Sequence, residues 1–309
     1  MIKGLFAGAS PFSQLIMLAF IMMVGFLVIM LTGILLAPLV LCISFSEIMN
    51  DFGSNTDVHH LNMMRYMQTI FHTGLFIIPA FIAAYLFSET VTGYLNLNQT
   101  TKSKWFCSVL MLMLATIPCI NLLATLNEMI VFPKSMSGLE QRLRDFEEAA
   151  RQTTELFLKT DHAGGMIFNI FMMAMLPALG EELIFRGILQ KLFARWTGNI
   201  HVAIIITGFL FSLIHFQFYG FFPRWILGVM FGYLLLWSGS LWLPIFAHFV
   251  NNTVAVMVSY LIHKEMIPEK VETIGSAWHD VPVIIVASAI CAWLLWKIYK
   301  NSKIIIHNP

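Results

Sequence analysis

Hydrophobic positions along the chain come in eight long runs that are separated by polar stretches. Most of these runs match the ~20 residues that an α-helix needs to cross the hydrocarbon core of a bilayer. They cover residues 12–45, 66–88, 105–127, 164–190, 200–219, 222–238, 241–262 and 281–299. The pattern predicts an all-α polytopic integral membrane protein of about eight transmembrane helices, in which residues 1–309 form a single membrane domain and the sixth helix is the shortest.

One long polar stretch, residues 129–163, lies between the third and fourth runs. On a helix from Gly138 to Lys159, its apolar residues fall near one stripe, whereas acid–base pairs four residues apart fall on other faces. The stripe holds Leu139, Leu143, Phe146, Ala150 and Phe157, and the pairs are Glu140/Arg144, Glu147/Arg151 and Glu155/Lys159. We predict an amphipathic interfacial connector, which either packs its stripe on the bundle or acts as a gate that captures substrate.

Composition narrows the class of protein further. Hydrophobic residues make up 58% of the 309 residues and charged residues 11%, with a mean hydropathy of +0.78. These values are typical of a protein whose partner is the lipid bilayer, and they exclude a soluble domain of ordinary composition. The net charge is +1 and the basic residues are scattered, so the chain lacks the field that a nucleic-acid-binding protein needs.

The distribution of basic residues predicts the orientation. Alternate loops share one side of a membrane, and the positively charged side faces the cytoplasm. The basic residues of the two termini and of the second and fourth loops are Lys3, Lys102, Lys104, Lys191, Arg195, Lys297, Lys300 and Lys303. Both termini are therefore predicted to be cytoplasmic.

Three charged residues interrupt the fourth hydrophobic run, namely Glu181, Glu182 and Arg186. Each unpaired charge at the middle of a bilayer costs roughly 2.5 to 3.5 kcal/mol on insertion scales. Glu182 and Arg186 are four residues apart on one helix face, so we predict that they form an ion pair. Glu181 points elsewhere and should find its partners on other helices.

Three polar residues on later runs are candidate partners of Glu181. His215 follows Phe211 by four residues on the fifth run, and His248 and Asn252 are four residues apart on the seventh. Because ionisable residues in a membrane rarely face lipid, these side chains should converge on an internal cavity. A carboxylate, two imidazoles and a carboxamide can supply a base, an orienting group and oxyanion donors for hydrolysis.

Other histidines precede these motifs. His59, His60 and His72 lie in or near the first loop and the start of the second run, without a nearby acidic cluster. We interpret them as solvated loop residues.

The ordered motifs resemble those of the CPBP (Abi) family of CAAX prenyl endopeptidases of the Ras-converting-enzyme type and their bacterial relatives. The motif residues are Glu181, Glu182, Arg186, Phe211, His215, His248 and Asn252, all within the predicted catalytic helices of residues 164–262. The resemblance implies an intramembrane peptidase in which Glu181 and His215 activate water and His248 and Asn252 bind the oxyanion. Glu182, Arg186 and Phe211 would support this site, and no cofactor is expected.

Alternative interpretations use the same atoms. Glu181, His215 and His248 could instead hold zinc with one position open to water, giving a metal-dependent version of the same protease. A non-enzymatic protein for binding, immunity or transport could also use buried polar residues. For the protease, we expect a peptide or protein substrate, lipidated or membrane-embedded, in the plasma membrane of a bacterium; an endoplasmic-reticulum membrane is the alternative location.

Overall fold

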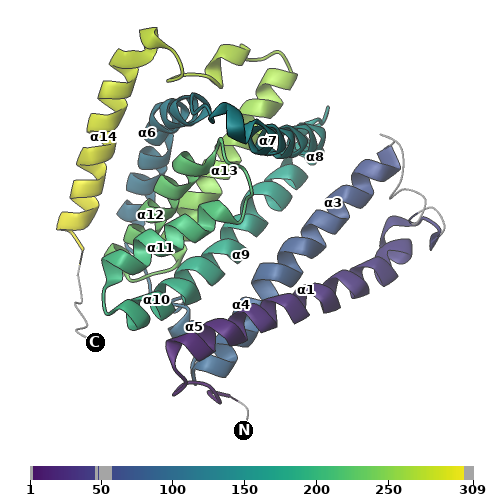
Figure 1. Cartoon of the computed structure of the whole chain (residues 1–309), viewed down its shortest axis with the longest axis vertical. Helices are drawn as coiled ribbons and strands as arrows, with labels where there is room; N and C mark the ends of the chain where they lie inside the picture. The colour runs from purple at the N-terminus through teal and green to yellow at the C-terminus, as the bar shows by residue number, and fades with distance from the viewer. Residues whose placement is uncertain (1–2, 46–47, 49–57, 303–309) are drawn as a thin grey trace.

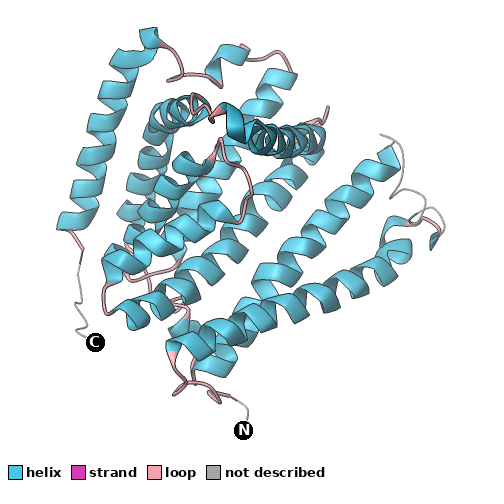
Figure 2. Cartoon of the chain, in the orientation of Figure 1, coloured by secondary structure: helices cyan, strands magenta, loops and turns pink. Residues whose placement is uncertain are grey.

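The computed structural model describes residues 3–45, 48 and 58–302, and the part that it describes is helical with no β-strand (Figure 2). Within these described residues, seven helical segments are long and apolar enough to cross a membrane, and an eighth apolar helix is shorter. The chain is an all-α polytopic membrane protein, as the hydrophobic runs predict. In chain order the longer elements are α1 (Pro11–Leu41), α3 (Val58–His72), η1 (Thr73–Ile77), α4 (Ile78–Phe87), α5 (Val91–Tyr94), α6 (Ser103–Glu128), α7 (Ser137–Leu158), α8 (Ala163–Asn169), η3 (Ile170–Met175), α9 (Leu176–Ile184), η4 (Phe185–Leu189), α10 (Gln190–Thr197), α11 (Ile200–Leu213), α12 (Phe221–Ser238), α13 (Trp242–His263) and α14 (Val281–Lys300).

The helices form a bundle with two outer walls around a central group (Figure 1). One wall consists of α1 with the continuous rod α3–η1–α4, and the other consists of α6 with α14. Between them lie α9 and α11 to α13, and the two ends of the chain lie toward the same end of the bundle. The cytoplasmic orientation of the termini stays a prediction, and Lys303 lies outside the described residues.

The outer walls expose large apolar side chains. Leu35 and Leu39 on α1 are 72% and 78% exposed, and Ile285 on α14 is 63% exposed. In water such a surface would be a strong aggregation liability, whereas lipid tails cover it without cost. The exposed side chains therefore identify α1 and α14 as lipid-facing elements.

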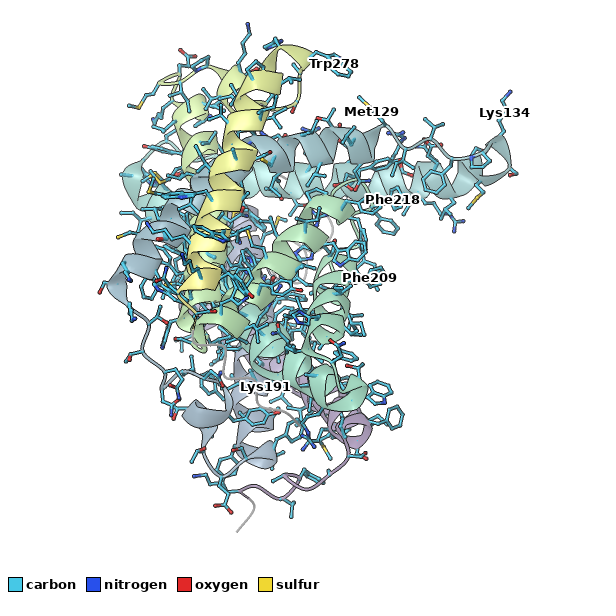
Figure 3. The ribbon with its side chains drawn as sticks, turned by 90° about the vertical axis from the view of Figure 1, so that its left-hand side faces the viewer. Met129, Lys134, Lys191, Phe209, Phe218 and Trp278 are labelled. Atoms are coloured by element: carbon cyan, nitrogen blue, oxygen red, sulfur yellow. The ribbon has the colours of Figure 1, made fainter. Side chains whose placement is uncertain are left out.

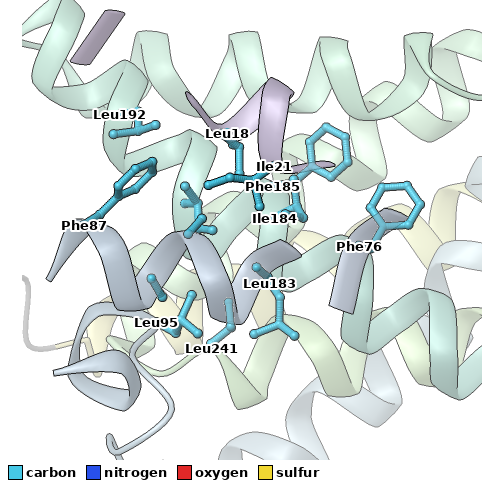
Figure 4. Packing of buried hydrophobic residues seen from close by; sticks show 14 of the residues in the cluster. Leu18, Ile21, Phe76, Phe87, Leu95, Leu183, Ile184, Phe185, Leu192 and Leu241 are labelled. Atoms are coloured by element: carbon cyan, nitrogen blue, oxygen red, sulfur yellow. The ribbon is translucent and has the colours of Figure 1, made fainter. Parts of the chain in front are cut away.

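A buried apolar cluster joins the N-terminal wall to the central helices (Figure 4). Leu18 of α1 and Phe76 of η1 belong to this cluster together with Leu183 of α9 and Ile188 of η4. Gly180 allows the closest approach, because a Cβ atom at this position would lie 2.8 Å from Phe76 Cβ. Small residues let helix backbones approach closely in membranes, so η1 and α9 are held face to face.

The fifth helix differs from the prediction. We expected the sixth run to be the shortest, but α11 has 14 residues and α12 has 18. The α11 helix ends because the chain turns back: Phe216 has a left-handed backbone with φ of 52°, and the His215 amide donates to the Ser212 carbonyl. His215 therefore lies in the turn between α11 and α12 and not on the helix itself.

The polar stretch between the third and fourth runs folds into α7, which the structure places across the end of the bundle. Lys134, just before α7, projects beyond the rest of the molecule (Figure 3). Phe157 at its C-terminal end is buried, whereas Leu139 and Phe146 of the predicted stripe are 45% and 61% exposed. Only the C-terminal part of the stripe packs on the bundle.

Two of the three predicted ion pairs on α7 are wrong. Arg144 pairs with Glu140 at 2.8 Å as expected, but Arg151 pairs with Glu148 at 2.7 Å and also contacts Glu155. Glu147 instead accepts hydrogen bonds from the Gln217 side chain and the Tyr219 amide, which belong to the α11–α12 turn. Exposed side chains can choose between several partners at similar cost, and Glu147 has a better one outside its helix.

Candidate active site

A cavity of about 1010 Å³ lies between the N-terminal wall, the central helices and α7. Its lining includes Glu181 from α9, His215 from the α11–α12 turn, and His248 and Asn252 from α13. The structure thus brings together the four side chains that the sequence analysis selected from separate runs. Most of the remaining lining is apolar, so the polar groups stand in a hydrophobic hollow.

Beside the cavity, Glu182 and Arg186 form the predicted ion pair, with 2.8 Å between Glu182 Oε1 and Arg186 Nη1. Both side chains are fully buried. The guanidinium also donates to the Gly228 carbonyl at 2.7 Å and lies 4.6 Å from the centre of the Phe211 ring. This arrangement offsets the cost of the buried charges and ties η4 to α12.

Glu181 has a different environment from its neighbour. It is 6% exposed, and the carboxylate makes no contact with Arg186 in ion-pair range. The nearest charged or ionisable partner among the described residues is His72, whose Nε2 lies 3.6 Å from Glu181 Oε1. The other oxygen, Oε2, is buried and accepts no hydrogen bond from the described residues.

His72 corrects the sequence analysis, which interpreted it as a solvated loop residue. It is 7% exposed, ends α3 and lines the cavity. The side chains of His59 and His60 lie outside the described part of the structure. His72 lies within the second hydrophobic run. Glu181 was selected because an ionisable residue inside a membrane helix is a functional candidate by default. The same criterion would have selected His72.

The site residues lie next to widened helical turns. The π-helical segment η1 begins directly after His72, and η3 and η4 flank the α9 helix that carries Glu181 and Glu182. Each π turn contains more residues than an α turn and therefore rotates the following side chains onto a different face. Such turns are frequent at functional sites, and here they decide which face of the rod meets the cavity.

Hydrogen bonds fix the orientation of both predicted histidines. His248 Nδ1 lies 3.0 Å from Glu182 Oε1, and His215 Nδ1 lies 2.8 Å from the Phe211 carbonyl. Both partners are acceptors, so each Nδ1 carries the proton and donates it. The Nε2 atom of each ring remains free of these bonds for contacts in the cavity.

Asn252 retains one donor for the cavity. Its Nδ2 donates to the Met173 carbonyl at 3.3 Å, and its Oδ1 accepts from Asn251 Nδ2 at 3.1 Å. Because a carboxamide nitrogen has two hydrogens, the second N–H of Asn252 is not used by these bonds.

Polar side chains satisfy the non-helical backbone around His215. Glu147 accepts from the Tyr219 amide, Asn127 Oδ1 accepts from the Phe222 amide, and Arg224 donates to the Gln217 carbonyl. Irregular backbone is tolerated at membrane depth only where such partners are present. These bonds hold the turn in place and connect it to α6 and α7, a role for Glu147 and Asn127 that the sequence analysis missed.

The candidate zinc ligands do not form a metal-binding group in this structure. Among the described residues, no group of three His, Cys, Asp or Glu side chains is close enough to bind one metal ion. Glu181, His215 and His248 share the cavity, but they do not form such a group as they stand. The mechanism proposed below therefore uses no zinc.

Part of this chain is similar to a known protein family. A family model described as "Type II CAAX prenyl endopeptidase Rce1-like" matches residues 163–254, the segment that contains every motif residue named above from Glu181 to Asn252. This segment is similar to the CPBP family of membrane endopeptidases, as its motifs indicate. His72 lies outside the matched segment.

Two curated relatives come from Bacillus subtilis (strain 168). The chain is 29% identical to "Uncharacterized protein YpbD" over 28% of its length, and 30% identical to "Sporulation-killing factor biosynthesis protein SkfC" over 39%. It spans 43% of the first relative and 26% of the second, less than half of either. No solved structure matches the chain.

Proposed function

We propose that this protein is an intramembrane endopeptidase that hydrolyses a peptide bond with water activated by Glu181. The observation that carries the proposal is the convergence of Glu181, His215, His248 and Asn252 on one cavity, where Glu181 has no ion pair with Arg186. The similarity of residues 163–254 to a family of membrane endopeptidases supports the same reaction class.

In the proposed mechanism, the Glu181 carboxylate takes a proton from water while His215 Nε2 accepts the hydrogen bond of the second water hydrogen. The resulting hydroxide attacks the carbonyl carbon of the scissile bond. The protonated Glu181 then gives the proton to the leaving amine, and the C–N bond breaks. General acid–base catalysis of this kind contributes about 10² to 10⁴ in rate.

The oxyanion of the tetrahedral intermediate would be bound by Asn252 and His248. Asn252 donates its remaining N–H. His248 donates from Nε2 when its ring carries both protons, since Nδ1 already donates to Glu182. Glu182, Arg186 and Phe211 are proposed to support the site by holding η4, α12 and the His248 ring together.

The substrate is proposed to be a peptide or protein segment that is lipidated or embedded in the membrane. The apolar lining of the cavity supports a hydrophobic substrate, and the membrane supplies such chains directly. The bacterial relatives favour the bacterial plasma membrane as the location.

One experiment tests the reaction in cells. We expect that a comparison of membrane proteomes from strains with the wild-type protein and with Glu181→Gln reveals new protein termini only in the wild type. The variant should accumulate to the same level, because Gln replaces Glu without a change in volume. A Glu181→Gln strain with unchanged termini and an intact phenotype would support a binding, immunity or transport role instead.

A second experiment tests the metal-free form of the mechanism. Purified protein treated with a strong chelator is expected to keep its full cleavage rate, because the proposed water activation uses only side chains. Loss of cleavage that added zinc restores would contradict this part of the proposal and favour the zinc-dependent version.

A further inference from the structure

A third histidine faces the proposed base from a helix outside the family-matched segment. His72 Nε2 lies 3.6 Å from Glu181 Oε1, and both side chains are more than nine-tenths buried. The distance is longer than a hydrogen bond but within ion-pair range, where a buried contact is strong because little water screens it.

Packing holds His72 in this position. The Phe71 and Phe76 rings lie 5.6 and 5.7 Å from the imidazole ring, and Gln68 Nε2 lies 3.3 Å from His72 Nδ1. The carboxylate in front of Nε2 favours a proton on that nitrogen, while Nδ1 faces both the Gln68 side-chain amide and, at 3.4 Å, the Gln68 carbonyl. The imidazole is thereby supported from behind and presents an N–H to Glu181.

The backbones bring the two residues together. Gly180 lies directly before Glu181, and a side chain at this position would collide with Phe76 and Ile77 of η1. The close approach of α9 and η1 therefore depends on Gly180, and it sets His72 opposite Glu181. The widened turn of η1 begins one residue after His72.

We propose that His72 is a positioning residue for Glu181, which engages Oε1 and so fixes the direction of the carboxylate in the cavity. This inference rests on the proposed role of Glu181 as the base. An outer partner of this kind fixes the orientation of a reactive group without touching the substrate, as carboxylates do for histidines in metal sites and catalytic triads. The N-terminal wall would then contribute to catalysis and not only to the shape of the cavity.

The first test measures cleavage by variants of His72. His72→Ala is expected to lower kcat by about 10- to 100-fold with KM within about twofold, since loss of an outer partner typically costs that much. His72→Gln should recover a large part of kcat, because its amide nitrogen can replace Nε2 as a donor. Added imidazole should raise the rate of His72→Ala but not that of His72→Gln.

Tyr66→Phe provides the matched control on the same helix. Tyr66 donates to the Gly33 carbonyl of α1 at 2.9 Å and does not line the cavity. Its loss loosens α3 against α1 and should leave kcat near the wild-type value. Equal losses of kcat in His72→Ala and Tyr66→Phe, with no recovery by Gln or imidazole, would reduce His72 to a packing role and overturn the proposal.

The second test does not depend on cleavage. A membrane-permeant carbodiimide modifies buried carboxyl groups, and mass spectrometry compares Glu181 with its neighbour Glu182, which stays paired with Arg186. Glu181 should react several-fold faster in His72→Ala than in the wild type, while Glu182 is unchanged. An unchanged rate of Glu181 modification would overturn the proposal for His72, whether or not the protein cleaves peptides. Faster modification in a protein that cleaves no substrate would support the His72–Glu181 contact and contradict the proposed peptidase function.

Discussion

Acid–base pairs occur in two contrasting regions of this protein, the buried α9–η4 segment and the exposed helix α7. Glu182 and Arg186 are fully buried and form the pair that their spacing predicts. On α7, Arg151 is 56% exposed and pairs with residues that the spacing did not select. A buried charge without a partner costs several kcal/mol, whereas exposed partners are exchanged at little cost. Burial, and not spacing, makes a predicted pair reliable.

Removal of the buried cation should have the largest effect on stability. Arg186→Met leaves Glu182 buried without its main partner, so we expect a loss of about 3 to 5 kcal/mol. Thermal unfolding of the protein in detergent measures this loss. The double variant Glu182→Gln/Arg186→Met should recover more than half of it, and Arg144→Met on α7 should unfold as the wild type does. A double variant as unstable as Arg186→Met would break the comparison.

Within the buried region, groups that reach the cavity should affect turnover more than stability. Asn252→Ala removes a proposed oxyanion donor and should lower kcat by about 100- to 1,000-fold with little change in the unfolding temperature. Thr253→Ala, at the next position of α13 and outside the cavity lining, should keep near-normal turnover. Similar kcat values for the two variants would remove Asn252 from the mechanism.

Replacement of glycine by alanine tests how tightly the buried helices and α7 are packed. A Cβ atom at Gly228 would lie 2.9 Å from Gly208 Cα and 3.2 Å from Arg186 Nη2, so Gly228→Ala should destabilise the protein by about 1 to 3 kcal/mol. Gly138 on α7 has no such neighbour within 4 Å, and Gly138→Ala should be neutral or slightly stabilising. Unfolding in detergent tests both variants, and equal stability would contradict the close crossing of α11 and α12.

The smallest effect is expected on the exposed face of α7. Hydrogen bonds from Arg151 lower the pKa of Glu148 to about 2, so the favourable interaction is present above the ordinary carboxyl pKa of 4.5 and is lost as the pH falls toward 2. Arg151→Gln should raise the pKa of Glu148 toward its ordinary value. Hydrogen exchange of α7 should therefore be faster than in the wild type at pH 7, and the difference should shrink as the pH falls toward 2. Cleavage at pH 7 should be unchanged.

The main features of the fold could be predicted from hydrophobic runs because lipid imposes a strong rule on every spanning segment. The end of α11 could not, since residues 214–219 continue the run with four aliphatic or aromatic side chains and the turn depends on distant partners such as Glu147 and Asn127. The sequence also could not predict which face of the helix each side chain occupies. Such a prediction assumes a uniform rotation of 100° per residue, and the π turns η3 and η4 depart from it.

For the candidate site, the sequence was sufficient to select Glu181, His215, His248 and Asn252, because polar residues inside apolar runs are costly and therefore conspicuous. His72 was overlooked since a histidine near the start of a run looks like a loop residue until the helix boundary is known. The rod α3–η1–α4 begins at Val58, well before the hydrophobic run, and this places His72 inside the bundle.

The short α11 helix has a consequence for the surrounding lipid. Its 14 residues give a rod of about 21 Å, less than the ~30 Å hydrocarbon thickness of a typical bilayer. Such hydrophobic mismatch is accommodated by a local thinning of the bilayer or by a chain reversal below the membrane surface. Both would shorten the distance between bulk solvent and Glu181, so the same helix that ends early at His215 would also shorten the path of the water that the proposed hydrolysis consumes.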